Sequence, residues 1–241
     1  TLDVDRYTID GKVRDAVVAV REIVPGEGRE ANWINDHQLY THGYGMVAAY
    51  GNEVTAEGQP SFFASDIPPT GELDIAQPRV YFGETSPNYS IVGAPEGAAP
   101  AELDYPDDAG TNGQRNNTYD GEGGVPLGSM FNKLLYAVKF QEMRILLSSD
   151  LNSESQILYD RNPRTRVQKA APWLTVDGDP YPAVVDGRIV WILDGYTTSN
   201  GYPYSSSTTL GEATADSTTA QSSFVASQRQ NEVNYIRNSV K

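Results

Sequence analysis

The stretch Ala183-Val184-Val185-Asp186-Gly187-Arg188-Ile189-Val190-Trp191-Ile192-Leu193 decides the fold class of this chain. Two apolar, β-branched runs flank the dipeptide Asp186-Gly187. Both central residues of a type I′ turn need positive φ angles, which Asp and Gly adopt more readily than most residues, so the pattern predicts a β-hairpin. We therefore expect a folded domain with a core of strands.

A second hairpin is predicted at the start of the sequence. Residues 2–10 alternate apolar and polar side chains, and Gly11 ends the run. The apolar residues 16–20 follow and suit a buried partner strand.

A small sheet is predicted further along the chain. Arg79–Phe82 and Tyr89–Val92 have the composition of strands and are expected to pair, and Leu103–Tyr105 is a candidate third strand. From Pro106 to Gly128 the chain is dense in Asp, Gly and Asn, which favour turns over regular structure. We expect a long loop there, and long loops in compact domains are often functional.

The clearest helix is expected over Ser129–Leu147, with its first residue as the cap. Its apolar residues recur at helical spacing and form a stripe: Phe131, Leu134, Leu135, Val138, Met143 and Leu146. Ser153 and Gln156 have the spacing of a capping box for a shorter helix. Pro163 suits the first turn of another helix, which would end near Pro172.

Strands and helices come in blocks, which favours an α+β fold with mixed or antiparallel sheets, hairpins and about three helices. We expect one α+β domain over residues 1–196. Residues 197–230 are rich in Ser and Thr, a low-complexity composition, and residues 231–241 are expected to form a return segment. Because the sequence starts without a methionine or targeting segment and stops after a strand-like pattern, we expect it to be cut from a longer chain.

Composition limits the partners and the chemistry. The 241 residues include 18 Lys and Arg against 32 Asp and Glu, a net charge of −14, which disfavours nucleic acid and anionic membrane surfaces. The sequence has no cysteine, so disulfides, thiolate metal sites and cysteine nucleophiles are excluded. The longest helix-like apolar stretch, residues 130–147, is interrupted by charged and amide side chains, and we do not expect it to span a bilayer.

The two histidines, His37 and His42, are five residues apart, whereas two ligands on one helix face lie three or four apart. A metal site made of both is therefore not expected. Asn32 is placed to cap a short helix in which His37 would be a packing residue. His42 is the better catalytic candidate because the small residues of Thr41–Gly45 would let a ligand approach closely. A loop histidine that only forms hydrogen bonds is the simpler interpretation.

Four aspartates, Asp177, Asp179, Asp186 and Asp194, lie close together in the sequence. Paired carboxylates bind calcium or share acid and base roles, which makes Asp177 and Asp179 candidate metal ligands. Asp179 and Asp194 are candidate catalytic partners of His42. Each aspartate also precedes a glycine or a proline, as turn-forming aspartates do, and we prefer that interpretation. No cofactor is predicted, and calcium is the one ion considered.

The glycine-rich loop Tyr119–Ser129 leads into the predicted helix and could bind an anion through free backbone amides. Gly123 and Gly124 would then approach the ligand, while Tyr119 and Tyr44 would line a groove for a carbohydrate or peptide. A glycine-rich connector and strand-packing tyrosines are the alternative interpretations.

Several longer phrases carry a resemblance over nearly the whole chain, in order: DVDRYTIDG (3–11), YTHGYG (40–45), DIPPT (66–70), VYFGE (80–84), YDGEGGVPLGS (119–129), ILLSSD (145–150), DGRIVWILDGYTTS (186–199) and NYIRNSVK (234–241). They resemble the large extracytoplasmic region of uncharacterised protein family 0182, bacterial integral membrane proteins known chiefly from actinobacteria. The Ser- and Thr-rich insert between Tyr204 and Gln230 is not part of the shared phrases.

The resemblance implies a multi-pass parent in the cell membrane, with transmembrane helices before Thr1 and the present chain as a soluble piece that faces outward. The transmembrane part of the parent is then an expected partner. The resemblance implies no reaction, since the family offers no catalytic residues to transfer to positions in this sequence.

Two hypotheses of different class follow. The leading one is a non-catalytic extracytoplasmic module that binds an envelope component or assembles with copies of itself, on a channel- or transporter-like base. The alternative is a cell-envelope hydrolase or transferase with His42 as base and Asp177, Asp179 or Asp194 as partner. Convergence of His42 with a carboxylate in one pocket would favour the enzyme.

Overall fold

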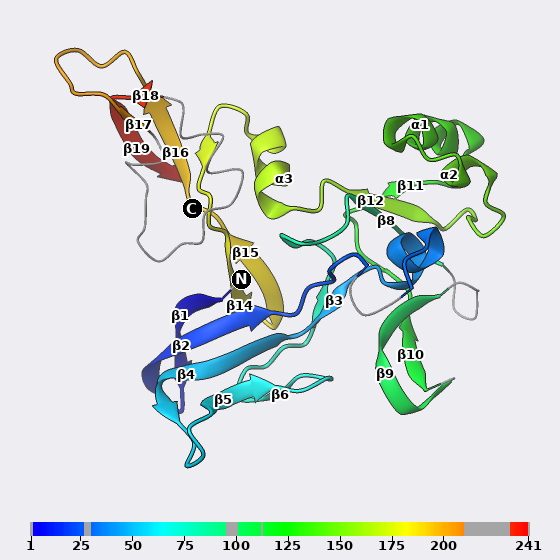
Figure 1. Ribbon diagram of the computed structural model, residues 1–241, viewed down its shortest axis with the longest axis horizontal. Coiled ribbons are helices and arrows are strands. Elements are labelled where there is room, and N and C mark those ends of the chain that lie inside the picture. Colours follow the sequence, from blue (N-terminus) through cyan, green and yellow to red (C-terminus); the bar gives the residue numbers. More distant parts are fainter. Residues whose placement is uncertain (1, 27–29, 95–100, 112, 210–231, 241) are drawn as a thin grey trace.

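A computed structural model describes residues 2–26, 30–94, 101–111, 113–209 and 232–240. Strands outnumber helices in these ranges, nineteen to four, so the α+β class is confirmed in a sheet-rich form. Figure 1 shows the sheet that contains β1, β2, β4 and β5 along one edge of the molecule and the helices α1 and α2 at another corner, with the carboxy-terminal strands on the opposite side from these helices. Within the described ranges, no helix has both the length and the apolar run that a membrane crossing requires.

The largest sheet is antiparallel, with the strand order β1-β2-β4-β5-β6. Its strands are β1 (Asp3–Ile9), β2 (Lys12–Val20), β4 (Met46–Val54), β5 (Pro60–Ser65) and β6 (Thr70–Gly71). Asp10 and Gly11 have φ angles of 49° and 71°, so the predicted amino-terminal hairpin is confirmed with a turn of two positive φ angles. One face of this sheet forms a core that includes Ala16, Val18, Met46 and Phe63.

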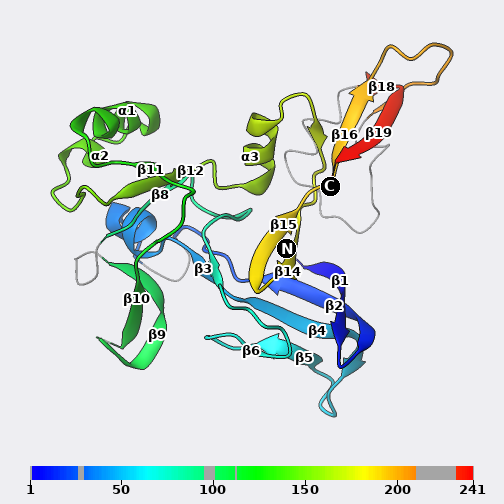
Figure 2. The same ribbon diagram turned by 180° about the vertical axis from the view of Figure 1, so that it is seen from behind.

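The hairpin predicted around Asp186-Gly187 is confirmed. Strands β14 (Tyr181–Val185) and β15 (Arg188–Ile192) pair in register, and the two turn residues have φ angles of 49° and 73°. Val184 and Ile189 pack against the core of the large sheet. Figure 2 shows from behind that this hairpin lies beside β1 and β2.

The second layer is a three-stranded sheet with the order β11-β12-β8. Its strands are β11 (Val125–Pro126), β12 (Gln156–Tyr159) and β8 (Tyr89–Val92). The predicted pairing of residues 79–82 with 89–92 is wrong, because β7 (Arg79–Val80) pairs with β3 (Gly43–Tyr44) and β8 pairs with β12. The helix predicted from Ser153 is also wrong. Asn152 forms the turn there by accepting from the backbone of Glu154 and Ser155, and β12 begins at Gln156.

A hairpin occupies much of the segment that was predicted as a long loop. Strand β9 (Glu102–Thr111) extends past the predicted 103–105 strand and pairs with β10 (Gln114–Asn117). An ion pair of 2.6 Å between Arg115 and Asp107 links the two strands. The hairpin projects from the body of the molecule below the short helix η1 (Asn35–Leu39) (Figure 1).

The carboxy-terminal part contains β13 (Thr175–Val176), β16 (Gly195–Ser199) and β19 (Tyr235–Val240) in one sheet, and β17 (Thr208–Thr209) with β18 (Glu232–Val233) in another. The predicted return segment runs as β19 beside β16, where Ser199 pairs with Tyr235. Most of the predicted low-complexity segment, residues 210–230, lies outside the described residues. The proposed domain boundaries stay a prediction.

Two of the shorter predicted helices are present. The Asn32 side chain accepts from the backbone N–H of Asn35 at the start of the short helix that contains η1. Helix α3 (Pro163–Ala170) begins at the predicted proline, with Asn162 as its N-cap. Both helices are therefore confirmed.

The long predicted helix is interrupted. Helix α1 (Met130–Phe140) is capped by Ser129, whose side chain accepts from the backbone of Asn132, as expected. It ends at Gln141, which has a φ angle of 54°, and a short helix α2 (Arg144–Leu147) follows. Ala137 is the buried residue of α1, and Ile145 of α2 joins the core formed with Tyr89 and Ile157.

Candidate functional site

The chain buries two carboxylates side by side. Glu102 and Asp104 are two residues apart on β9, so both point to the same face of the strand, and they are only 1% and 8% exposed. Glu102 accepts four hydrogen bonds: from the Thr41 hydroxyl at 2.9 Å, the Tyr81 hydroxyl at 2.8 Å, and the backbone N–H groups of Gly93 and Tyr119 at 3.0 and 3.1 Å. This carboxylate is fully satisfied by the fold.

Asp104 forms hydrogen bonds with two side chains, those of Arg79 and His42. Arg79 donates to both of its oxygens at 2.7 and 2.6 Å, and Nε2 of His42 lies 3.2 Å from Oδ1. Burial alone would raise the pKa of Asp104, but the hydrogen bonds from His42 and Arg79 and the charge of Arg79 hold it below its usual value. The carboxylate is therefore stabilised in its ionised form.

His42 stands between a hydroxyl and a carboxylate. Its Nδ1 lies 3.0 Å from Thr41 Oγ1, and its Nε2 contacts Asp104, which is the order of groups in a hydrolase triad. Thr41 and His42 are 0% and 3% exposed, however, and the Thr41 hydroxyl donates its hydrogen to Glu102. The Thr41 hydroxyl is therefore not directed at the imidazole as the nucleophile of a triad is, and the whole group is buried.

Arg161 is a further buried member of this polar network. It is 1% exposed and donates to the backbone carbonyls of Tyr81 and Thr41 and to the hydroxyl of Ser90. Burial lowers the pKa of this guanidinium to about 10, although nearby acidic groups act in the opposite direction and raise it. Arg161 thus contacts residues that lie 71 to 120 positions before it in the sequence.

The predicted ligand-binding residues lie around the same network and are used for packing. The ring of Tyr44 lies 5.1 Å from that of Tyr105, and burial raises the pKa of Tyr44 to about 12. Tyr119 accepts from the backbone N–H of Gly123 at 3.0 Å. A Cβ added at Gly123 would lie 2.9 Å from the Phe82 ring, and one at Gly124 would lie 2.7 Å from Gln156, so close packing explains both glycines.

The predicted aspartates lie elsewhere in the fold. The carboxylates that contact His42 are Asp104 and, at 3.9 Å, Glu102. Asp177 follows β13 and accepts from the Tyr196 hydroxyl at 2.8 Å, and its backbone N–H donates to the carbonyl of Asp194. Asp179 interacts with Asp3 instead. The pKa of Asp3 is raised to about 6, mainly by burial and to a smaller extent by the negative charge of Asp179. Across the described ranges, no group of three or more His, Asp or Glu could hold a metal ion.

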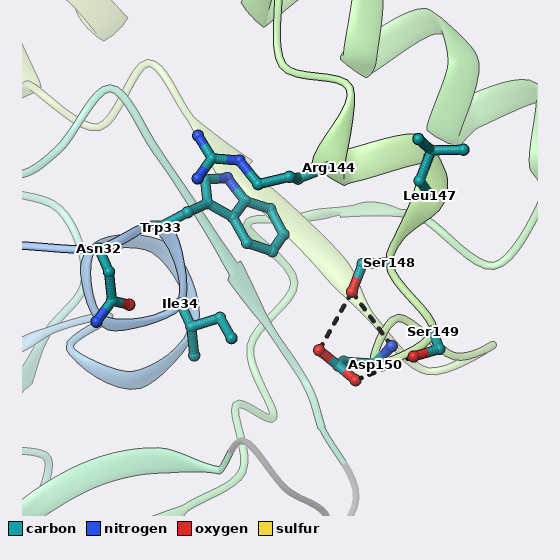
Figure 3. Close-up of a pocket in the computed structure, with 8 residues that line it drawn as sticks. All are labelled: Asn32, Trp33, Ile34, Arg144, Leu147, Ser148, Ser149 and Asp150. Atoms are coloured by element: carbon teal, nitrogen blue, oxygen red, sulfur yellow. Dashed lines mark hydrogen bonds between the residues drawn. The ribbon is translucent and has the colours of Figure 1, made fainter.

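A groove of about 570 Å³ opens on the surface between η1 and α2 (Figure 3). It is lined by Asn32, Trp33, Ile34, Arg144, Leu147, Ser148, Ser149 and Asp150. The Arg144 guanidinium lies 5.5 Å from the centre of the Trp33 ring and is paired with Glu142. Trp33 itself is 7% exposed and donates to the Tyr89 hydroxyl at 2.8 Å, so it forms part of the core rather than a free stacking platform.

Beside the groove, the apolar stripe of the predicted helix faces outward. Seven apolar side chains of α1, α2 and their connection are 46 to 74% exposed. We refer to them as the α1–α2 face: Met130, Phe131, Leu134, Leu135, Val138, Met143 and Leu147. Leu147 belongs to both the face and the groove. Monomeric proteins rarely expose so many neighbouring apolar side chains, and such patches mark interaction surfaces.

Two of these features were missed from the sequence. The spacing of Glu102 and Asp104, with Leu103 between them, was a signal for two carboxylates on one strand face. Arg161 carried no signal, because its partners come from distant segments.

The fold and these sites define a strand-rich α+β module with a closed polar centre and an open apolar helical face. The chain belongs to the Uncharacterised protein family (UPF0182), whose pattern matches residues 1–241. This confirms the resemblance seen in the sequence.

Similar proteins come from actinobacteria. The chain is 58% identical to a UPF0182 protein of Arthrobacter sp. (strain FB24), 55% identical to one of Bifidobacterium adolescentis and 57% identical to one of Frankia alni. Each match covers 100% of this chain but only 22 to 24% of the relative, so the chain spans about a quarter of their length. No solved structure matches the chain.

Proposed function

We propose that the chain is a non-catalytic binding and assembly module of a multi-pass membrane protein, placed outside the cytoplasmic membrane on a channel- or transporter-like base. The observation that carries the proposal is the α1–α2 face. Its apolar side chains are more exposed to water than neighbouring apolar side chains on the surface of a monomeric protein usually are. Burial of such side chains releases about 25 cal/mol per Å² of apolar area, which drives association.

The occupant that we propose for the α1–α2 face is another segment of the same polypeptide. Relatives are about four times longer than this chain, so a large part of the polypeptide is present to cover it. A lipid surface is a less suitable occupant. The chain carries a net charge of −14, which an anionic membrane would repel, and the acidic Glu142 and Asp150 adjoin the face.

The buried network supports the non-catalytic part of the proposal. Thr41, His42, Glu102 and Asp104 are all less than 10% exposed, and hydrogen bonds join them to one another, to Arg79 and to Tyr81. Satisfied buried networks of this kind fix a unique packing, which suits a rigid module.

Cysteine labelling tests the proposal, because the chain has no cysteine of its own. In the full-length protein, with any cysteines outside this region replaced, Val138→Cys should react with a water-soluble maleimide at least about tenfold more slowly in the native than in the unfolded state. Glu57→Cys, in an exposed turn far from α1, is the matched control and should show no such protection. Equal reactivity of the two native variants would overturn the assembly role.

The second candidate is a cell-envelope hydrolase, and the triad-like order Thr41, His42, Asp104 is the observation that favours it. It would need the network to open, since Thr41, His42 and Asp104 are each less than 10% exposed. Turnover of chromogenic esters or amides by the full-length protein, lost in His42→Gln and kept in the buried control Ser90→Ala, would support this candidate. Absence of such turnover fits the assembly module.

A further inference from the structure

The groove between η1 and α2 carries one uncompensated charge. Arg144 is paired with Glu142 through both Nε and Nη2, so these two side chains are neutral together. The Asp150 carboxylate is exposed and accepts only from the hydroxyls of Ser148 and Ser149, each at 3.3 Å. Within the described part of the chain, Asp150 has no cationic partner within 4.0 Å. Asp150 is therefore the carboxylate of the groove lining that a further cation can pair with.

The rest of the groove is suited to a long aliphatic stem. Ile34 and Leu147 are 41% and 74% exposed, and Figure 3 shows them among the lining residues with Trp33 and Asp150. Lys and Arg side chains combine such a stem with a charged head, and they bury the stem on apolar surface while the head keeps polar contacts. A sugar is a poorer fit, because Trp33 is only 7% exposed and the Arg144 guanidinium lies 5.5 Å from the centre of its ring.

The groove continues into the α1–α2 face through Leu147, so one segment of polypeptide can contact both. The chain has 32 acidic against 18 basic side chains, which favours a basic partner. We infer that the groove binds a Lys or Arg side chain of the polypeptide segment that covers the α1–α2 face, with Asp150 as its ionic partner and Ile34 and Leu147 along its stem. This inference rests on the proposed assembly role and adds the chemistry of the partner.

The test uses Ser149→Cys in the full-length protein as a reporter inside the groove. Maleimide labelling of this cysteine should be at least about tenfold slower in the native than in the unfolded state. Asp150→Lys, which places two cations together, should remove the protection, and Asp150→Asn should weaken it several-fold. Asp150→Glu keeps the charge and should retain most of it. Asp108→Lys makes the same charge change at an exposed site on β9 and should have no effect.

Two outcomes would overturn the inference while leaving the assembly role intact. One is free labelling of Ser149→Cys although Val138→Cys is protected, which would mean that the partner covers α1 but leaves the groove empty. The other is full protection of Ser149→Cys in the Asp150→Lys variant, which would mean that the occupant is not cationic. Free labelling of both reporters would overturn the inference and the assembly role together.

Discussion

The network around Glu102 and the α1–α2 face are opposite in character. The network is polar and lies where an apolar core is usual, with Glu102 and Arg161 each 1% exposed. The face is apolar and lies in water, with Val138 at 69% and Leu147 at 74%. The difference is one of partners: every group of the network that we described has its hydrogen bonds, whereas the face has nothing that covers it within the described residues.

This comparison separates what stabilises the module from what it offers to other chains. Changes in the network should lower the stability of the chain itself. Changes in the face should leave that stability almost unchanged and act on assembly.

The largest effect is expected at Arg161. Arg161→Met should lower the free energy of unfolding by about 3–5 kcal/mol, because it leaves the carbonyls of Thr41 and Tyr81 buried without donors. Urea denaturation of the purified chain measures this. The control Arg115→Met removes an ion pair whose arginine side chain is 55% exposed and should cost less than about 1 kcal/mol. Similar losses in both variants would contradict the role of burial.

A somewhat smaller effect, with a defined pH dependence, is expected at Asp104. Asp104→Asn should cost about 2–3 kcal/mol at pH 7, because Arg79 and His42 lose their charged acceptor. The native pKa of Asp104 lies below its ordinary value of 3.8, so its contribution is present above that value and is lost as pH falls through the native pKa. The parent should therefore lose stability below about pH 4 more steeply than the variant in urea denaturation.

Asp3 should behave in the opposite way. Its native pKa is raised to about 6, and one of its oxygens is buried with no hydrogen-bond partner, so the ionised form is unfavourable. The protonated carboxyl stabilises the fold. This contribution is fully present below pH 3.8, the ordinary pKa of an aspartate, and is lost as pH rises through the native pKa of about 6. Asp3→Asn should therefore gain about 1–2 kcal/mol at pH 8 and nothing near pH 4. A loss of stability at pH 8 would contradict the assignment.

The smallest effect on stability is expected on the α1–α2 face. Val138→Ser should change the free energy of unfolding of the purified chain by less than about 0.5 kcal/mol, because Val138 is already exposed. Its neighbour Ala137 is 2% exposed, and Ala137→Leu should cost about 1–3 kcal/mol by overpacking. If Val138→Ser were as costly as Ala137→Leu, the outward orientation of the face would be wrong.

The elements that could be predicted are those with a local cause. The hairpin at Asp186-Gly187 could be predicted because its two positive φ angles depend on two adjacent residues, and the amino-terminal hairpin because alternation that ends at Gly11 is a local pattern. The Ser129 cap and the Pro163 start were found for the same reason. The pairing of β7 with β3 and of β8 with β12 could not be found, because it joins segments far apart in the sequence.

One candidate residue from the sequence, His42, lies in the buried network. His42 was chosen from its small neighbours, and its carboxylate partner proved to be Asp104, 62 residues away, where no local pattern links the two. Helical spacing predicted the apolar stripe on α1. Spacing alone does not distinguish an apolar face that packs in the core from one that is exposed and can bind a partner. Gln141 adopts a left-handed conformation that ends α1, which its residue type did not indicate.

The central claim is that the α1–α2 face is covered by another segment of the same polypeptide. A photo-activated benzophenone side chain in place of Val138, in the full-length protein within its membrane, tests it most directly when the products are mapped by mass spectrometry. The account predicts cross-links to peptides of the same polypeptide outside these 241 residues. Cross-links to lipid or to a second copy alone, or no cross-link at all, would contradict it.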